Sequence, residues 1–316
     1  MKLVTSTGDF NWYVDSIAET VKAFKGSSFK YINLEQPDKH PVFFSDKDDG
    51  WKKLADDWGN AAAEAGVTYV VSHAPCLSTA YLNVLQDPED EAYHVNLRPL
   101  VRSIEICHIL EIPRIVVHPC LDRAFNSERF YIYNKKFYGD LLKVAEKYDI
   151  TIMTENCDNN GTRFSTGKEL RDFIDYVDHP LFAACWDTAH GNMDEVARGI
   201  GQYQNIITLG DKLKGLHIAD NFGDSHHHSW PFAGIINFDS VMQGILDVNY
   251  DGYFTFEASY TLLHQNNIPY HRSDWQHNGK SVTKLLNPPL SLKQKAVELL
   301  YETGKYILEP YNCFEL

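Results

Sequence analysis

Short β-rich runs alternate regularly with longer amphipathic segments along the chain, and this alternation leaves few folds open to it. The apolar runs lie at residues 2–7, 29–35, 67–73, 113–119, 150–156, 181–187, 213–220 and 252–258. The helix-like segments between and after them lie at 12–25, 50–65, 91–110, 128–148, 167–178, 194–204, 237–248 and 290–307. Continuous apolar strands that alternate with helices indicate a parallel sheet covered on both faces.

Eight strand–helix units predict a closed α/β barrel of the (β/α)₈ type rather than an open, doubly wound sheet. The chain has 316 residues, and no Pro/Gly/Ser-rich linker divides it, so we expect a single domain over residues 1–316. It lacks a G-x-G-x-x-G run after its first strand and a G-x-x-x-x-G-K-[ST] loop, which argues against a dinucleotide fold and a P-loop. The long polar segment 259–290 between the last strand and the last helix is expected to form a lid or a subunit contact in a homo-oligomer.

The charge and cysteine content exclude several classes of protein. The chain carries 43 Asp and Glu against 29 Lys and Arg, a formal charge of −14, which disfavours binding to nucleic acids or anionic membranes. No apolar run approaches the length of about 20 residues of a membrane-spanning helix, and the N-terminus lacks an apolar stretch of signal length. The six cysteines are scattered without a CxxC pair, so we expect reduced thiols and a cytoplasmic protein.

Ionisable side chains end six consecutive predicted strands. They are His73, His118, Glu155, Asp187, His217 and Glu257, and His190 follows three residues after Asp187. The carboxyl ends of barrel strands form the active-site rim, so these side chains should converge there. Converging carboxylates repel one another and are costly to bury unless a cation neutralises them. A mixed carboxylate and imidazole set suits Mn²⁺, Mg²⁺, Co²⁺ or Zn²⁺, so the sequence predicts a divalent cation at the rim.

Three motifs at these strand ends resemble one known family. TENC (154–157), WDTAH (186–190) and LHIADN (216–221) are similar to the E-N, D-x-x-H and H-x-x-D-N signatures of the xylose isomerase-like TIM barrel superfamily. This superfamily contains ketose 3-epimerases, inosose dehydratase-like and hydroxypyruvate isomerase-like enzymes, and endonuclease IV. The resemblance covers roughly residues 1–258. It implies one divalent cation, Mn²⁺ before the others, held by Glu155, Asp187, His217 and Glu257.

The resemblance also implies roles for individual side chains. In ketose epimerases the two Glu ligands act as acid and base on opposite faces of the sugar, which assigns catalysis to Glu155 and Glu257. The histidine of the D-x-x-H signature binds substrate beside the metal, which points to His190. Many sugar enzymes of the superfamily use further rim histidines on substrate hydroxyls, and aromatic rings pack on the C–H faces of sugars. The additional expected substrate contacts are His73, His118, His228 and Trp186.

The expected activity is isomerisation or epimerisation of a free sugar or keto-polyol through an enediolate. A proton next to a carbonyl is too weakly acidic to leave unaided at pH 7, so a divalent cation must stabilise the charge that develops while a carboxylate takes the proton. We find no phosphate-binding motif, which favours a non-phosphorylated substrate of carbohydrate metabolism. The same site also suits a lyase that dehydrates a keto-inositol or eliminates a β-leaving group from a 3-keto-glycoside, so this alternative stays open.

A phosphodiesterase similar to endonuclease IV is the second alternative. That enzyme holds three zinc ions, and its extra ligand positions correspond here to His73, His118, His226 and His228. Two departures stand out: His226 occupies the place of an Asp, and Phe232 replaces the first Gly of the H-x-x-x-G-x-G pattern. An abasic-site endonuclease would need a multinuclear zinc site and a surface for DNA, and the net charge argues against the latter.

Overall fold

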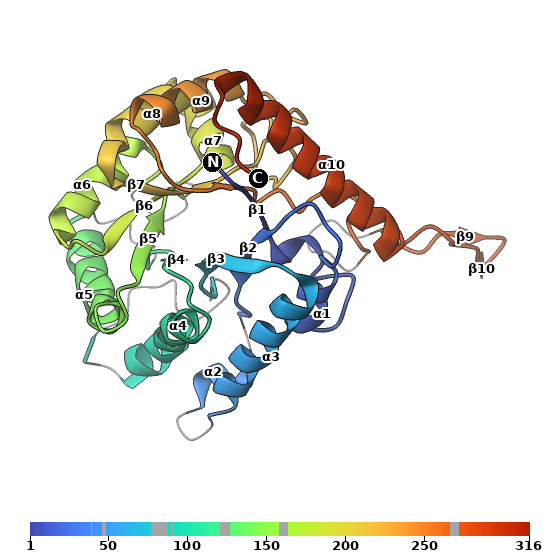
Figure 1. Cartoon of the computed structure of the whole chain (residues 1–316), viewed down its shortest axis with the longest axis horizontal. Helices are drawn as coiled ribbons and strands as arrows, with labels where there is room; N and C mark the ends of the chain where they lie inside the picture. Colours follow the sequence, from blue (N-terminus) through green and yellow to red (C-terminus); the bar gives the residue numbers. More distant parts are fainter. Residues whose placement is uncertain are drawn as a thin grey trace.

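Parallel strands surrounded by helices form a nearly closed barrel (Figure 1). The computed structural model describes residues 1–38, 40–45, 49–76, 88–89, 91–120, 127–157, 164–265 and 272–316. The strands are β1 Leu3–Ser6, β2 Tyr31–Glu35, β3 Thr68–His73, β4 Arg114–Val116, β5 Thr151–Glu155, β6 Phe182–Asp187, β7 Leu213–His217 and β8 Phe254–Thr255. They form one eight-stranded sheet in the order β7-β6-β5-β4-β3-β2-β1-β8. A parallel bridge between Ile218 and Phe256 joins its two edges just beyond the strand ends.

The helices follow the strands along the chain and surround the sheet. They are α1 Ile17–Lys22, α2 Pro41–Phe44, α3 Gly50–Ala65, α4 Glu91–Ile109, α5 Ser127–Ala145, α6 Gly167–Val177, α7 Thr188–Arg198, α8 Gln202–Leu209, α9 Phe238–Asp247 and α10 Leu290–Leu308. Short 3₁₀ turns lie at η1 Thr7–Asp9, η2 Gly210–Lys212 and η3 Glu309–Tyr311. This arrangement confirms the predicted (β/α)₈ barrel with an extended segment between β8 and α10.

One predicted helix is wrong in its extent. The segment 194–204 is not continuous, because α7 ends at Arg198 and α8 begins at Gln202. Gly199 adopts a left-handed conformation with φ of 76°, and its N–H bonds to the carbonyl of Glu195. A residue at positive φ ends a helix, and glycine does so at little cost. The apolar pattern of the sequence therefore continues across a break in the helix at Gly199.

The apolar core has two layers, and their packing limits where a ligand can bind. The interior layer is a small plug whose buried members are Val4, Val70, Val71, Val116, Met153, Ala183 and Cys185. A much larger layer lies between the strands and the helices and includes Phe10, Phe29, Trp186 and Phe256. Because the interior is packed with side chains as in other barrels, open space at the carboxyl ends of the strands is where a site can form.

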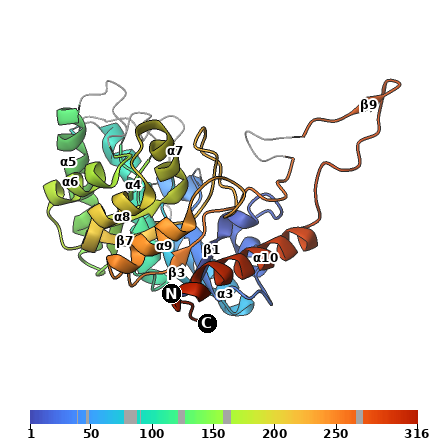
Figure 2. The same cartoon turned by 90° about the horizontal axis from the view of Figure 1, so that it is seen from above.

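The segment after β8 leaves the barrel and returns to it. A short hairpin, β9 Gln276–His277 paired with β10 Lys280–Ser281, stands clear of the barrel body (Figure 2). Residues 266–271 of the predicted lid or oligomer contact lie outside the described residues, and its role stays a prediction. The chain ends meet on the other side, where Lys2 bridges to Glu315. Among the described residues, no helix combines the length and the apolar character needed to cross a membrane.

Candidate metal centre

The carboxyl ends of the strands bring together the side chains that the sequence singled out. His73, Glu155, Asp187 and His217 are the last residues of β3, β5, β6 and β7. His118 and Glu257 follow two residues after β4 and β8. Glu155, Asp187, His217 and Glu257 each offer one ligand atom, and these atoms all lie within 4.8 Å of one another. The predicted ligand set is therefore close enough to surround a single ion.

Asp187 is held in place by the start of the helix that follows it. Its Oδ1 accepts a hydrogen bond of 2.6 Å from the backbone N–H of His190, which makes Asp187 the N-cap of α7. Asn156 bonds the backbone N–H and C=O of Asp187 through its side-chain amide, at 2.6 and 2.9 Å. Asn156 therefore orients Asp187, not the carboxylate of its sequence neighbour Glu155 as its position would suggest.

Glu155 lies at the centre of a ring of imidazoles. Its carboxylate lies 3.1 Å from His118 Nε2, 3.2 Å from His217 Nδ1 and 3.4 Å from His190 Nδ1. Burial would raise the pKa of Glu155, but these histidines lower it well below its usual value. These histidines therefore favour the ionised form of Glu155 although its side chain is almost completely buried.

His217 shows why this cluster suits a cation better than internal hydrogen bonds. Its Nδ1 lies 3.0 Å from Glu257 Oε2 and 3.2 Å from Glu155 Oε2. Even so, neither ring nitrogen of His217 makes a hydrogen bond, and Asp187 Oδ2 also lacks a partner. Buried polar atoms are normally satisfied, and a group left without a partner costs free energy. Short distances without hydrogen-bond geometry are what ligand atoms facing a common point would show, so these residues fit a bound divalent cation.

The same competition between burial and nearby charge shifts the pKa values of Glu257, Asp187 and His190. Burial raises the pKa of Glu257, but His217 and His228 lower it well below its usual value. The pKa of Asp187 is raised, because its burial outweighs the attraction of His190. Burial lowers the pKa of His190, but the charges of Asp187 and Glu155 raise it to about 9. The side chains of the centre can neutralise its negative charge only if they take up protons.

A further donor group lies beside this centre. Asp187, His190 and His226 also place ligand atoms within 4.8 Å of one another. The ring of His226 lies 4.0 Å from that of His190 and 4.3 Å from that of His228. Burial and these two neighbours lower the pKa of His226 to about 2, and its Nε2 has no hydrogen-bond partner. A neutral imidazole with a free nitrogen is a competent metal ligand.

Two more donor groups include His73 at the end of β3, and one of them also includes His118, which follows β4. His73, Glu155 and His217 form one, and His73, Cys76 and His118 form the other. His73 Nε2 lies 3.2 Å from His118 Nε2, while His73 Nδ1 contacts the carbonyl of Ala74 at 2.7 Å. The rim histidines thus add nitrogen donors around Glu155.

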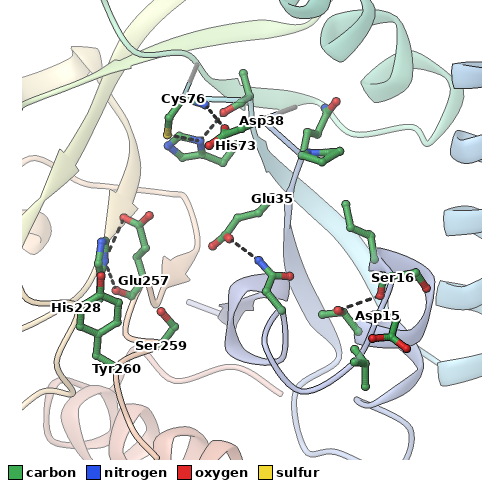
Figure 3. Close-up of a pocket in the computed structure, with 17 residues that line it drawn as sticks. Asp15, Ser16, Glu35, Asp38, His73, Cys76, His228, Glu257, Ser259 and Tyr260 are labelled. Atoms are coloured by element: carbon green, nitrogen blue, oxygen red, sulfur yellow. Dashed lines mark hydrogen bonds and ion pairs between the residues drawn. The ribbon is translucent and has the colours of Figure 1, made fainter. Parts of the chain in front are cut away.

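A cavity of about 430 Å³ opens beside the centre. Figure 3 shows His73, Glu257 and His228 on its wall, with Glu35 pointing into it from the end of β2. Its remaining lining comes from residues that follow β1, β2, β3 and β8. The open space therefore extends from the cluster toward the β1–β2 side of the barrel, which gives a ligand room to contact both.

The predicted substrate contacts do not all lie at this cavity. His73 and His228 line it, and His118 and His190 contact Glu155. Trp186 is completely buried, and its Nε1 donates to Gln202 Oε1 of α8 at 2.9 Å. Successive side chains of a strand point to opposite faces, so Asp187 faces the mouth while Trp186 packs in the helix layer. The structure does not support a substrate contact for Trp186.

Glu35 is a cavity residue that no motif in the sequence marked. It ends β2 just as the predicted ligands end their strands, and the structure puts it in the cavity wall. The strand-end signal was present, but no family motif accompanied it. Tyr260 and Ser259 also line the cavity, and no pattern in the sequence marked them.

Curated relatives match the chain over much of its length. The uncharacterized protein y4fM of Sinorhizobium fredii is 33% identical over 262 residues, 78% of this chain and 82% of the relative. The uncharacterized protein MJ1311 of Methanocaldococcus jannaschii is 26% identical over 195 residues, 60% of this chain and 64% of the relative. The probable endonuclease 4 of Nitrosopumilus maritimus is 26% identical over 191 residues, 55% of this chain and 66% of the relative. The chain spans slightly less than two thirds of the last two.

Solved structures share the fold at low sequence identity. D-Psicose 3-epimerase with D-tagatose from Clostridium cellulolyticum H10 has a TM-score of 0.69 and 13% identity, covering 98% of this chain and 99% of that one. The 3-keto-D-glucoside 4-epimerase YcjR of E. coli has a TM-score of 0.65 and 16% identity, covering 96% and 99%. The IolI protein with a binding zinc atom has a TM-score of 0.66 and 15% identity, covering 98% and 99%.

A family model matches most of the chain. The model described as xylose isomerase-like TIM barrel matches residues 21–277, which include every barrel strand except β1 and every predicted metal ligand. Together with the barrel, the converging strand ends and the relatives, this match places the chain in the xylose isomerase-like TIM barrel family.

Proposed function

We propose that this chain is a divalent-metal-dependent sugar isomerase or epimerase that acts on a free sugar or keto-polyol through an enediolate. The observation that carries the proposal is the set of buried Glu155, Asp187 and His217 with half-buried Glu257, whose ligand atoms lie within 4.8 Å of one another beside an open cavity. The similarity to epimerase structures agrees with it, because two of them act on ketohexoses or keto-glucosides by their names.

The four side chains would hold the cation, with Mn²⁺ the expected ion. When bound, it would stabilise the negative charge that develops on the substrate oxygens. Glu257 lines the cavity, so its carboxylate is placed to take a proton from a substrate carbon on that side. In isomerisation Glu257 would return this proton to the neighbouring carbon. In epimerisation Glu155, first protonated from solvent through a neighbouring histidine, would give a different proton to the opposite face of the same carbon. His190, which contacts both Glu155 and Asp187, would bind a substrate oxygen. A lyase would use the same groups and differ in losing a leaving group.

Metal analysis and isotope exchange test the proposal together. Untagged protein, purified without added metal, should contain about one Mn, Mg, Co or Zn per chain. Incubated in deuterium oxide with ketoses and keto-inositols, it should introduce solvent deuterium at the carbon next to the carbonyl. Release of water or of a glycosidic leaving group would identify the lyase instead. Metal-loaded protein that exchanges no deuterium and eliminates nothing would overturn the proposal.

An abasic-site endonuclease is the second candidate, and one observation favours it. The groups around His73, His118 and His226 add nitrogen donors beside the main set. A relative is named probable endonuclease 4, which agrees with this candidate. It predicts about three zinc ions per chain and cleavage of DNA at abasic sites. The formal charge of −14 opposes DNA binding, which is why we rank it below the sugar enzyme.

A further inference from the structure

Glu35 is a built part of the cavity and not a surface side chain that happens to reach it. One carboxylate oxygen accepts a hydrogen bond from Ser6 Oγ, and the other accepts one of 3.3 Å from Asn11 Nδ2. The backbone N–H of Glu35 donates to Thr7 Oγ1 at 2.9 Å. The turn after β1 therefore fixes both the backbone and the carboxylate of Glu35.

Gly8 leaves the space that this carboxylate occupies. A Cβ at this position would come within 2.6 Å of Glu35 Oε2 and 2.8 Å of its Cδ. Real Cβ atoms do not approach other heavy atoms so closely, so a larger residue at position 8 would displace the carboxylate. The absence of a side chain at Gly8 thus keeps Glu35 pointed into the cavity, where Figure 3 shows it.

The cavity around Glu35 offers hydrogen-bond acceptors and negative charge. Four carboxylates line it: Asp15, Glu35, Asp38 and Glu257. Among its described lining residues there is no Lys or Arg. Lys293 lines a smaller adjoining cavity with Glu35, but its ammonium already contacts Asp9 and the carbonyls of Ser259 and Thr261. A ligand in this space meets acceptors that need donors and meets like charge if it is an anion.

We propose that Glu35 is a specificity-determining residue, which accepts hydrogen bonds from hydroxyl groups at the end of the substrate remote from the metal centre and excludes a phosphate group there. This inference rests on the proposed function, because it takes the centre around Glu257 as the reacting end. Two halves of it can be separated: the hydrogen bonds that Glu35 makes with a neutral chain, and the repulsion that it exerts on an anionic one.

The test compares neutral sugars with their phosphate esters. The probes are D-fructose and D-tagatose, each against its 6-phosphate, with dissociation constants measured calorimetrically on the full, metal-loaded chain. Wild-type protein should bind at least one neutral sugar about tenfold or more tightly than its ester, and Glu35→Gln should reduce this preference about tenfold. Glutamine keeps the shape and an acceptor for Ser6 while removing the charge. Glu64→Gln, an exposed position on α3 that pairs with Lys22, is the matched control and should leave the preference unchanged.

A second variant moves the carboxylate without removing its charge. Gly8→Ala should weaken binding of the neutral sugar several-fold and give no gain for the ester. Thermal unfolding of each variant checks that the chain still folds. Equal affinity of wild type for sugar and ester, an unchanged preference in Glu35→Gln, unchanged sugar binding in Gly8→Ala, or no binding of either neutral sugar would each overturn the proposal.

The binding experiment can contradict the role of Glu35 without contradicting the proposed function, and the reverse also holds. Selective binding of neutral sugars that depends on Glu35, without any deuterium exchange or elimination, would contradict the isomerase and leave the role of Glu35 intact. Deuterium exchange with a sugar phosphate, unaffected by Glu35→Gln, would contradict the role of Glu35 and leave the isomerase intact.

Discussion

The Asp9–Lys293 pair and the centre around Glu155 both bury ionisable groups near the mouth of the barrel, but their partners differ. Lys293 Nζ lies 3.6 Å from Asp9 Oδ1 and donates to the carbonyls of Ser259 and Thr261 at 2.8 and 2.9 Å. Asp9 Oδ2 accepts a hydrogen bond of 2.6 Å from Thr5. Asp9 Oδ1 makes no hydrogen bond, but it faces the ammonium of Lys293. In the centre, Asp187 Oδ2 and both ring nitrogens of His217 make no hydrogen bond.

This difference separates the structural use of buried charge from the use that we propose for the centre. The lysine pair joins α10 to the segment after β8, and its one oxygen without a hydrogen bond, Asp9 Oδ1, faces a cation of the chain itself. That segment also supports the site, because the N–H of Tyr260 donates to the carbonyl of His228, and His228 Nδ1 contacts the carbonyl of Glu257. Buried donor atoms that lack partners instead fit the divalent cation that we propose for the centre.

The largest expected effect comes from removing one carboxylate of the centre. Glu155→Gln and Glu257→Gln should each lower the rate of deuterium exchange by about 10²–10⁴-fold, the usual contribution of general acid–base catalysis. Metal analysis of the same samples separates a lost acid or base from a lost ligand. Wild-type activity in Glu155→Gln protein that still binds its metal would contradict the catalytic assignment.

Removing the Asp9–Lys293 ion pair should lower the stability of the protein more than its activity. Lys293→Met leaves Asp9 buried without its cation, so we expect a loss of about 3–5 kcal/mol in the free energy of unfolding. The double variant Asp9→Asn with Lys293→Met removes both charges and should recover part of this loss. Denaturant unfolding of the three proteins measures it. A single variant as stable as wild type would show that the pair does not hold α10 to the barrel.

The pH dependence of metal-free protein sharpens the comparison. Because Asp187 and Glu155 raise the pKa of His190 to about 9, from an unfolded value near 6.5, its stabilising charge is fully present below pH ~6.5 and is lost as the pH rises through ~9. A bound cation would neutralise Asp187 and Glu155, so metal-loaded protein would not gain stability from a protonated His190. The stability gap between metal-loaded and metal-free protein should therefore widen over this window, by about 3 kcal/mol at most. Melting temperatures measured with and without a chelator test this, and a constant gap would contradict it.

Trp186 provides the smallest effect. Trp186→Phe removes the hydrogen bond to Gln202 in the helix layer, so we expect a loss of about 1 kcal/mol in stability. Sugar binding and deuterium exchange at a permissive temperature should stay at wild-type values. A selective loss of sugar affinity would restore the substrate contact that the sequence suggested.

The sequence by itself determined the barrel, and it named most of the residues that meet at the candidate site. Strand runs and the residues that end them are local patterns, and parallel strands carry their last residues to one rim whatever the details of packing. This is why Glu155, Asp187, His217 and Glu257 could be named as one ligand set from the sequence and its family resemblance, and why the structure brings them together.

Tertiary structure decided what depends on facing and on distant partners. Trp186 and Asp187 are neighbours in sequence, yet strand alternation sends them to opposite layers. Glu35 reaches the cavity because the turn at Gly8 leaves room for its carboxylate. Lys293 meets Asp9 across a separation of most of the chain, and a local pattern cannot specify such a pairing. These features arise only when the barrel closes and packs its first strand against its last helix.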